Sequence, residues 1–363
     1  MIDFEPTEEQ ALVTETVRQF AENEIRPQAR ECDEAAALPR EVLDTAHELG
    51  LIANGLPEEY GGGGEPSAML GVLIAEELAW GDVSIALGIL SPSLLGVPVA
   101  RFGTDEQKRR VLGRLTADTF VAGALAITEP RFDSDPFRPQ TTAKRDGAEY
   151  ILDGAKCQVP WLDGGEEVLV VAADDGDPQA FLVPRGAAGI DVEIEKNLGT
   201  HALPLAELGL SGVRVPAEAR LGGEAGADLR EIINRGRVGL SAVAVGMARA
   251  GFEASRDYAK ERETFGQPIA SRQAIAFKIA DMAIEIDAAR MLLWQAACAI
   301  DAGEDATRYA ALAYEQAKRT ALQVSDDAVQ VFGGYGFIRD YLPEMYLRNA
   351  GGFISSFEAL TLV

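Results

Sequence analysis

Apolar side chains recur at helical spacing in the first part of the chain. Residues 7–49 follow this pattern, and Thr7 stands where a helix cap is expected. A glycine run, Gly61–Gly64, interrupts the pattern, which resumes from residue 66 to about residue 117. We therefore predict a helical N-terminal domain over residues 1–119.

The pattern changes in the middle of the chain. Short β-rich runs replace the helical spacing, and Gly, Pro and Asp separate them. The runs are Tyr150–Leu152, Val168–Ala172, Ala180–Val183 and Val192–Ile194. Such alternation is typical of a compact antiparallel sheet or barrel. We expect a middle β-barrel-like domain over residues 120–225.

Helical spacing returns after Gly226 and continues to the end of the chain. In the segment Ala274–Ala302 the apolar residues follow steps of three, four and seven, which suits a helix packed in a bundle. Residues 306–332 repeat the pattern with a narrower apolar stripe. The predicted fold is α+β and mainly α, with a four-helix bundle over residues 226–363.

Composition and charge narrow the classes of function. The 363 residues carry a net charge of −25, which repels nucleic-acid phosphates and disfavours DNA or RNA as a partner. No apolar stretch is long enough to span a membrane, and the first residues lack the basic and apolar regions of a secretory signal. We expect a cytoplasmic protein whose acidity serves its solubility.

Cysteines and histidines are few and scattered. Cys32, Cys157 and Cys298 are far apart and form no CxxC pair, and His47 and His201 have no metal-ligand spacing. We expect neither a disulfide framework nor a metal site.

Three segments could carry chemistry, and the first surrounds a helix end. In the segment Tyr258–Ile269, Gly266 forces a turn after the predicted helix. Arg262 and Thr264 would lie near that end, free to meet a phosphate, with Phe265 beside them. The plainer alternative is an arginine that caps helix carbonyls above a buried phenylalanine.

The second segment, Gln330–Phe337, is rich in glycine. Gly333, Gly334 and Gly336 let the backbone approach a ligand closely and expose its amides to phosphate. The plainer alternative is a glycine helix cap followed by a turn. The segment lacks the preceding strand of a dinucleotide-binding fingerprint.

The third segment, Ile127–Asp135, lies at the entry to the predicted sheet. The hydroxyls of Thr128 and Ser134 could hold the edge of a ring or a carbonyl group. The alternative is an ordinary turn.

Together and in this order, the three segments resemble the acyl-CoA dehydrogenase family along nearly the whole chain. Leu56–Gly62, Arg101–Lys108 and Ala280–Ala283 match as well. The resemblance implies an FAD-dependent oxidoreductase of fatty acid metabolism that acts on an acyl-CoA substrate and passes electrons to an electron-transferring flavoprotein. It also implies a homo-oligomer, a dimer with shared flavin sites or a homotetramer.

The resemblance assigns a role to each candidate residue. Arg262, Thr264 and Phe265 would contact the FAD diphosphate, with Gln273 near them, and Gln330, Gly333 and Gly334 would line the adenosine-diphosphate part of a neighbouring subunit's FAD. Thr128 and Gln158 would contact the flavin, Ser134 would lie on the pantetheine side of the thioester, and Arg237 would lie beside the acyl site.

The family's reaction removes two hydrogens from neighbouring carbons of the acyl group. A carboxylate takes the α-proton while the β-hydride goes to flavin N5. The family usually places this glutamate in a Tyr–Glu–Gly motif near the C-terminus. Counted without gaps from Arg348 the base position falls on Phe357, and one inserted residue moves it to Glu358. We assign Glu358, with a surface glutamate as the alternative, because the order aromatic–Glu–small in Phe357–Glu358–Ala359 matches the motif. The family's other base position is Gly236 here, which cannot act as a base.

Several positions depart from the family pattern. The usual Lys–x–Trp–Ile–Thr is Lys156–Pro160 here, so Pro160 offers a flavin neither a hydroxyl nor an N–H, and Trp161, which could substitute for the missing ring, is shifted in register. Phe132–Asp133 and Thr200–Leu203 replace other family residues. These changes indicate an unusual substrate, a weak flavin site, or a catalytically weak or inactive homologue that acts as partner subunit in a hetero-oligomer. A dehydrogenase of a carrier-protein-bound acyl group, or another flavin chemistry, is a further alternative.

Overall fold

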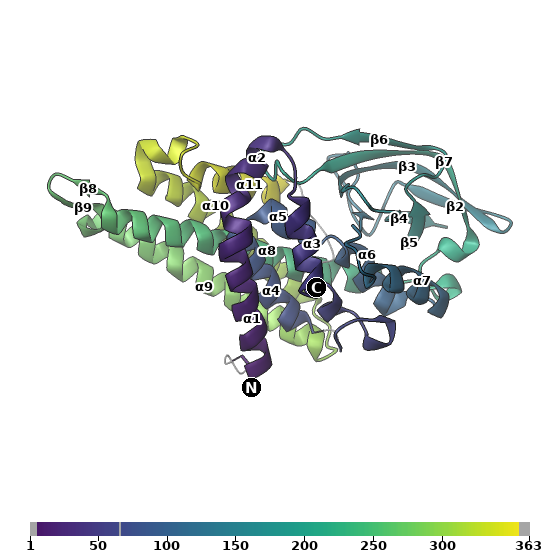
Figure 1. The fold of residues 1–363 in the computed structure, drawn as a ribbon. Helices are drawn as coiled ribbons and strands as arrows, with labels where there is room; N and C mark the ends of the chain where they lie inside the picture. The colour runs from purple at the N-terminus through teal and green to yellow at the C-terminus, as the bar shows by residue number, and fades with distance from the viewer. Residues whose placement is uncertain (1–5, 65–66, 356–363) are drawn as a thin grey trace.

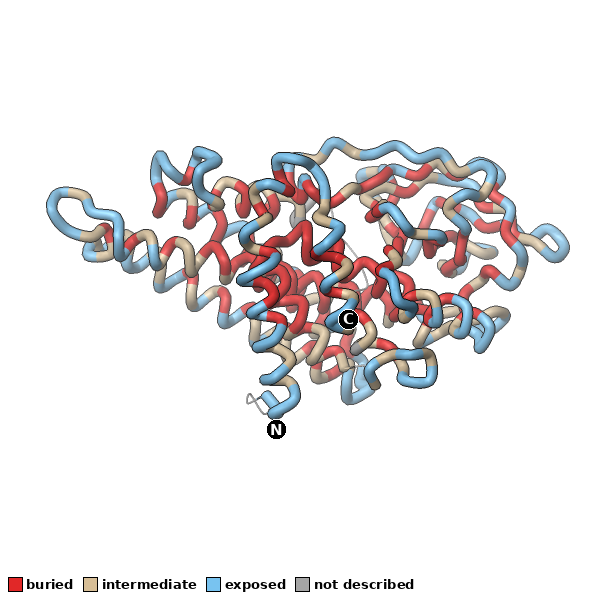
Figure 2. Tube along the Cα trace, viewed as in Figure 1, coloured by how far each residue is buried: buried red, intermediate tan, exposed pale blue. Residues whose placement is uncertain are grey.

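The computed structural model describes residues 6–64 and 67–355. The expected order of a helical region, a curled sheet and a second helical region is confirmed. The sheet forms one end of the molecule, and a hairpin formed by β8 (Glu263–Thr264) and β9 (Gln267–Pro268) forms the other (Figure 1). Buried residues concentrate where the helices of the two helical regions pack together and between the layers of the sheet (Figure 2).

The N-terminal region contains seven described α-helices. They are α1 (Glu8–Phe20), α2 (Ala29–Ala35), α3 (Arg40–Glu48), α4 (Ala68–Gly81), α5 (Val83–Ile89), α6 (Ser93–Phe102) and α7 (Asp105–Leu115). Thr7 caps α1 as expected, because its hydroxyl accepts from Gln10 N at 3.2 Å and the Gln10 side chain accepts from Thr7 N. Helix α5 is buried on all sides, in keeping with its almost wholly apolar sequence.

The middle region folds as a seven-stranded sheet. Its strands are β1 (Leu125–Ala126), β2 (Thr142–Asp146), β3 (Glu149–Pro160), β4 (Glu167–Asp174), β5 (Asp177–Pro184), β6 (Ile190–Ile194) and β7 (Leu205–Pro216). Four pairings are antiparallel, as expected, but β1 and β2 both pair with β4 in parallel. The parallel pairs arise because the chain crosses back before it reaches β4, a long-range connection that local sequence patterns do not reveal.

The C-terminal region is a bundle around one long helix. Helix α8 (Leu229–Glu261) packs against α10 (Thr307–Phe332), α9 (Gln273–Asp301) and α4, and α11 (Pro343–Ser355) packs against α10. Within α9 the predicted stripe is buried at Met282, Ile286, Leu293 and Ala297. A second apolar stripe on α9 faces outward, since Phe277, Ile284 and Met291 are 61%, 63% and 39% exposed.

No single described helix has the length and apolar character to cross a membrane, although the bent pair α5 and α6 reaches that threshold together.

Candidate active site

Residues 127–129 form a short segment directly after β1, which we call the strap. A buried lysine binds it through hydrogen bonds. Lys156 lies on β3 with its side chain fully buried, and its Nζ donates to Ile127 O at 2.9 Å and to Glu129 Oε1 at 3.1 Å. Burial lowers the pKa of Lys156 to about 8, and the Glu129 carboxylate opposes that shift. The ammonium group thus fixes both ends of the strap.

Glu129 is held by backbone groups as well as by the lysine. Its two carboxylate oxygens accept hydrogen bonds from Gln140 N at 2.9 Å and Thr141 N at 2.7 Å. Burial raises the pKa of Glu129, but these N–H donors and Lys156 more than offset it and hold the pKa below its usual value. Glu129 therefore stays ionised within the fold.

The strap brings together the two hydroxyl residues that the sequence singled out. Cys157 N donates to Thr128 O at 2.9 Å, and Glu129 N donates to Ser134 Oγ at 3.1 Å. The hydroxyl of Thr128 makes no hydrogen bond with any described residue. Thr128 and Ser134 therefore border one surface, and no described residue occupies the Thr128 hydroxyl.

Gln158 lies beside the strap in an unusual backbone conformation. Its φ is 57°, and its N–H donates to Glu195 Oε1 at 2.6 Å. A non-glycine residue rarely adopts this left-handed region, so the Glu195 carboxylate stabilises a conformation that the backbone alone disfavours. The side-chain Oε1 of Gln158 is buried and has no hydrogen-bond partner among the described residues. An unused buried acceptor of this kind points to a missing donor.

The ring of Trp161 is already covered within this chain. Arg185 Cζ lies 4.1 Å from the centre of the ring, and Arg185 Nη1 donates to Leu162 O at 2.6 Å. Burial lowers the pKa of Arg185 to about 10, with Asp163 opposing the shift. Pro160, one residue earlier, is buried at the end of β3.

The first sequence segment forms the turn that follows α8. Arg262 ends the helix, Thr264 lies in β8, and Phe265 stands at the tip with a φ of 53°. Phe265 is 97% exposed, so the alternative of a buried phenylalanine beneath a capping arginine is wrong. Gln273 is exposed at the first position of α9, on the same side of the molecule.

The second segment closes α10. Gln330 is exposed in the last turn, and Gly333 caps the helix with a φ of 61°, so the plainer interpretation as a helix cap holds. An added Cβ at Gly333 or at Gly334 would meet no atom within 4 Å. The space above both glycines is therefore open to a ligand.

These two segments meet at the hairpin end of the bundle. Arg262 Cζ lies 5.3 Å from the ring centre of Tyr335, and the rings of Tyr258 and Phe332 stack at 4.0 Å. This end lies opposite the sheet, which carries the strap and Gln158 (Figure 1). One chain therefore places its two groups of candidate residues far from each other.

The remaining candidates lie on α8 and in the tail. Arg237 is half-buried on α8, and its guanidinium makes no hydrogen bond or ion pair with a described residue. Glu358 lies outside the described residues. The last described helix, α11, is tied to the rest of the fold by Arg348, which donates to Asp33 at 3.0 and 2.6 Å and to Leu198 O at 3.0 Å.

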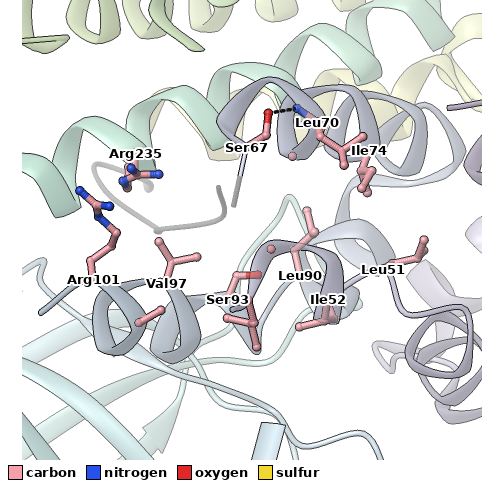
Figure 3. A pocket seen from close by; sticks show the side chains of 14 residues that line it. Leu51, Ile52, Ser67, Leu70, Ile74, Leu90, Ser93, Val97, Arg101 and Arg235 are labelled. Carbon is pink, nitrogen blue, oxygen red and sulfur yellow. Dashed lines mark hydrogen bonds between the residues drawn. The ribbon is translucent and has the colours of Figure 1, made fainter. Parts of the chain in front are cut away.

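An apolar cavity lies between α4, the corner of α5 and α6, and α8. Its side chains include Leu70, Ile74, Leu90 and Val97, and Figure 3 shows Arg235 near one end. Sequence patterns do not single out this arginine, nor Lys156 as a strap anchor. Both cations have polar or charged neighbours in the sequence, so only the packing of the fold reveals their burial.

Three family profiles match consecutive parts of the chain. Their descriptions are acyl-CoA dehydrogenase, N-terminal domain, over residues 7–119, middle domain over residues 124–213, and C-terminal domain over residues 227–353.

Individual proteins resemble the chain over nearly its full length. The probable acyl-CoA dehydrogenase YngJ of Bacillus subtilis (strain 168) is 37% identical over 96% of this chain and 94% of its own. The structure of butyryl-CoA dehydrogenase from Megasphaera elsdenii has a TM-score of 0.90 and 31% identity, covering 99% of this chain and 97% of that one. A glutaryl-CoA dehydrogenase from Mycobacterium smegmatis, in complex with FADH2, has a TM-score of 0.89 and 28% identity, covering 98% and 92%.

Proposed function

The chain belongs to the acyl-CoA dehydrogenase family, and from this premise we propose that it oxidises an acyl-CoA thioester with Glu358 as the base. Family membership confirms the expected oxidoreductase class and FAD as the cofactor. FAD, when bound, supplies the two-electron acceptor for the β-hydride. Loss of the α-proton to a carboxylate and of the hydride to the flavin leaves an α,β-unsaturated thioester.

The strap above Lys156 is the observation that carries this proposal. It holds Thr128 beside Gln158, and neither the Thr128 hydroxyl nor the buried Oε1 of Gln158 has a hydrogen-bond partner among the described residues. Ring N–H and carbonyl groups of a flavin would satisfy a hydroxyl and an acceptor placed in this way. The residues present therefore fit a flavin ring, although Pro160 contributes no donor to it.

The phosphate half of the site is proposed to come from a second copy of the chain. Arg262 and Gly333 lie at the hairpin end, away from the sheet that carries the strap, and we infer that the two halves of each FAD site come from different subunits. A homodimer in which each hairpin end approaches the other subunit's strap completes two equivalent sites. Thr264, Phe265, Gln273, Gln330 and Gly334 would join Arg262 and Gly333 there.

The outward apolar stripe of α9 supports further association. Phe277 and Ile284 are each more than 60% exposed and lie one heptad apart, so they line the same face. We infer that this face packs against another copy, giving a dimer or tetramer.

The proposed substrate residues are Ser134 on the strap side and Arg237 on α8. Ser134 would border the thioester, and Arg237 offers a guanidinium that no described residue binds. An electron-transferring flavoprotein is the proposed acceptor of the electrons from reduced FAD.

The visible spectrum of the purified protein tests this function. We expect flavin absorbance that bleaches when butyryl-CoA, octanoyl-CoA or another acyl-CoA is added without oxygen. Glu358→Gln should keep the flavin bands and lose the bleaching. A protein that stays colourless after incubation with FAD would contradict the proposal and favour the inactive-subunit alternative that Pro160 raises.

A further inference from the structure

The apolar cavity beside α8 is small and ends on charged groups. Its volume is ≈ 50 Å³, which gives room for a few heavy atoms, since one water needs roughly 10–15 Å³ of such space. Leu70, Ile74, Leu90 and Val97 form apolar walls, whereas Arg101 and Arg235 stand together at one end (Figure 3). A cavity of this kind suits an apolar chain that ends in an anionic group.

Only one hydrogen-bond donor of the Arg235 side chain has an acceptor among the described residues. Its side chain is 9% exposed, and its Nε donates to Glu231 Oε1 at 3.1 Å. Arg101 donates to the same oxygen at 2.9 Å. No described residue accepts a hydrogen bond from Nη1 or Nη2 of Arg235. Two guanidinium groups therefore share one carboxylate, and the buried one has donors that no described residue uses.

The surrounding charges offset the burial of Arg235 only in part. Burial lowers its pKa, Glu231 and more weakly Asp301 oppose the shift, and Arg101 adds to it. The Asp301 carboxylate binds the start of α4, where it accepts hydrogen bonds from Ala68 N at 2.6 Å and Met69 N at 3.1 Å. A further anion at this end of the cavity would be attracted by the positive charge of Arg235. It would also accept hydrogen bonds from the Arg235 donors that no described residue uses.

The corner between α5 and α6 joins this cavity to the proposed active site. Leu90 and Ser93 of this corner line the cavity. On its other side the corner contacts the chain that leads into β1, because an added Cβ at Gly123 would come within 2.4 Å of Ser91 O. Strand β1 ends just before the strap, so one short segment separates the strap from the cavity.

Resting on the proposed function, we propose that the cavity receives the distal end of the acyl group and that Arg235 selects acyl-CoA thioesters that carry a carboxylate there. The carboxylate would accept hydrogen bonds from Nη1 and Nη2 of Arg235, while the apolar walls cover the methylene groups before it. Arg101, which is 49% exposed, contributes charge rather than a buried contact.

Matched thioesters test this selection. Flavin bleaching is followed with glutaryl-, adipyl- and suberyl-CoA, each paired with the methyl-ended acyl-CoA of the same length. We expect the carboxylate-ended member to have the higher kcat/KM for at least one length. Arg235→Met should lower the ratio of the two kcat/KM values by roughly tenfold or more, because a charge-assisted hydrogen bond is lost.

Two further variants separate charge from packing. Arg235→Lys keeps the positive charge and should retain part of the preference for carboxylate-ended thioesters. Glu231→Gln removes the carboxylate that competes for Arg235 and should raise that preference. Arg230→Met removes an exposed cation one turn earlier on α8 and should leave the ratio unchanged.

The possible failures are distinguishable. If no thioester of either kind bleaches the flavin, the proposed function fails. If methyl-ended thioesters are oxidised as well as their carboxylate-ended partners, and Arg235→Met and Glu231→Gln leave the ratio unchanged, this inference alone is overturned. Should Arg235→Met not fold, the opposite shifts expected for Arg235→Lys and Glu231→Gln still decide the question.

Discussion

Lys156 Nζ lies 3.1 Å from Glu129 Oε1 in the interior of the protein, with the two side chains 0% and 4% exposed. A buried ion pair seldom adds much stability by itself, because both charges must leave water. This pair has a positional effect instead, since the same ammonium group binds Ile127 O and the same carboxylate binds two backbone N–H groups. It fixes the strap on which the proposed flavin contact Thr128 lies.

Lys156→Met tests this anchoring. The change leaves Glu129 buried with only the more distant Arg131 guanidinium, 3.8 Å away, as a cation, so we expect the free energy of unfolding to fall by about 3 kcal/mol and FAD occupancy to fall with it. Chemical denaturation of the apoprotein and flavin absorbance measure the two effects. Lys144→Met, an exposed lysine on the neighbouring strand, is the control. The added change Glu129→Gln should recover part of the lost stability, and a variant as stable as Lys144→Met would refute the anchoring role.

Gln158→Leu separates flavin binding from stability. The change removes the buried Oε1 that lacks a partner, so the apoprotein should gain about 1 kcal/mol of stability. FAD affinity should fall at the same time, because the proposed acceptor is lost. Ser325→Ala removes another buried oxygen without a described partner, on α10, and should leave FAD affinity unchanged. Melting curves measure the change in stability, and FAD titrations measure the change in affinity. An unchanged FAD affinity in Gln158→Leu would show that Gln158 does not bind the flavin.

Mixed dimers test whether the flavin site is shared. Thr128→Tyr should block the ring half of the site, and Arg262→Ala should weaken the phosphate half. Each variant alone should lose FAD from both sites of its homodimer. A dimer of one subunit of each kind keeps one site with both halves intact, so co-purified mixed dimers should regain flavin and bleaching. Mixed dimers as empty as the parent variants would show that each subunit binds FAD alone.

Asp82 should make stability depend on pH. Burial raises its pKa from 3.8 to about 6, Asp33 adds to the shift, and hydrogen bonds from backbone N–H groups, including that of Ile85, oppose it. The unfolded chain therefore loses this proton at lower pH than the folded one. The contribution of Asp82 to the free energy of unfolding is fully present below pH 3.8 and is lost as the pH rises through about 6.

Asp82→Asn removes this titration and keeps a helix cap at the start of α5. At neutral pH the variant should be more stable than the natural protein by up to about 3 kcal/mol, and the difference should shrink toward pH 4. Unfolding at several pH values measures it. A difference that does not vary with pH would show that Asp82 keeps an ordinary pKa in the folded protein.

Sequence alone determined the features that depend on neighbours along the chain. Helical and strand spacing predicted the order of helices, sheet and helices, Thr7 was identified as a cap, and the turn after α8 followed from Gly266. The order of the short motifs was sufficient to indicate the family. Each of these features follows from local backbone preferences and hydrophobic periodicity, which a linear sequence records directly.

Tertiary structure decided the contacts between residues far apart in sequence. Packing, not spacing, placed Lys156 against Glu129, covered Trp161 with Arg185, and left the end of Arg235 without a described partner. It also set Arg262 at the hairpin end, away from the sheet that carries the strap, and the proposed sharing of one site between two copies rests on this arrangement. Such relationships depend on how whole elements pack in three dimensions, and the period of a helix or strand carries no information about them.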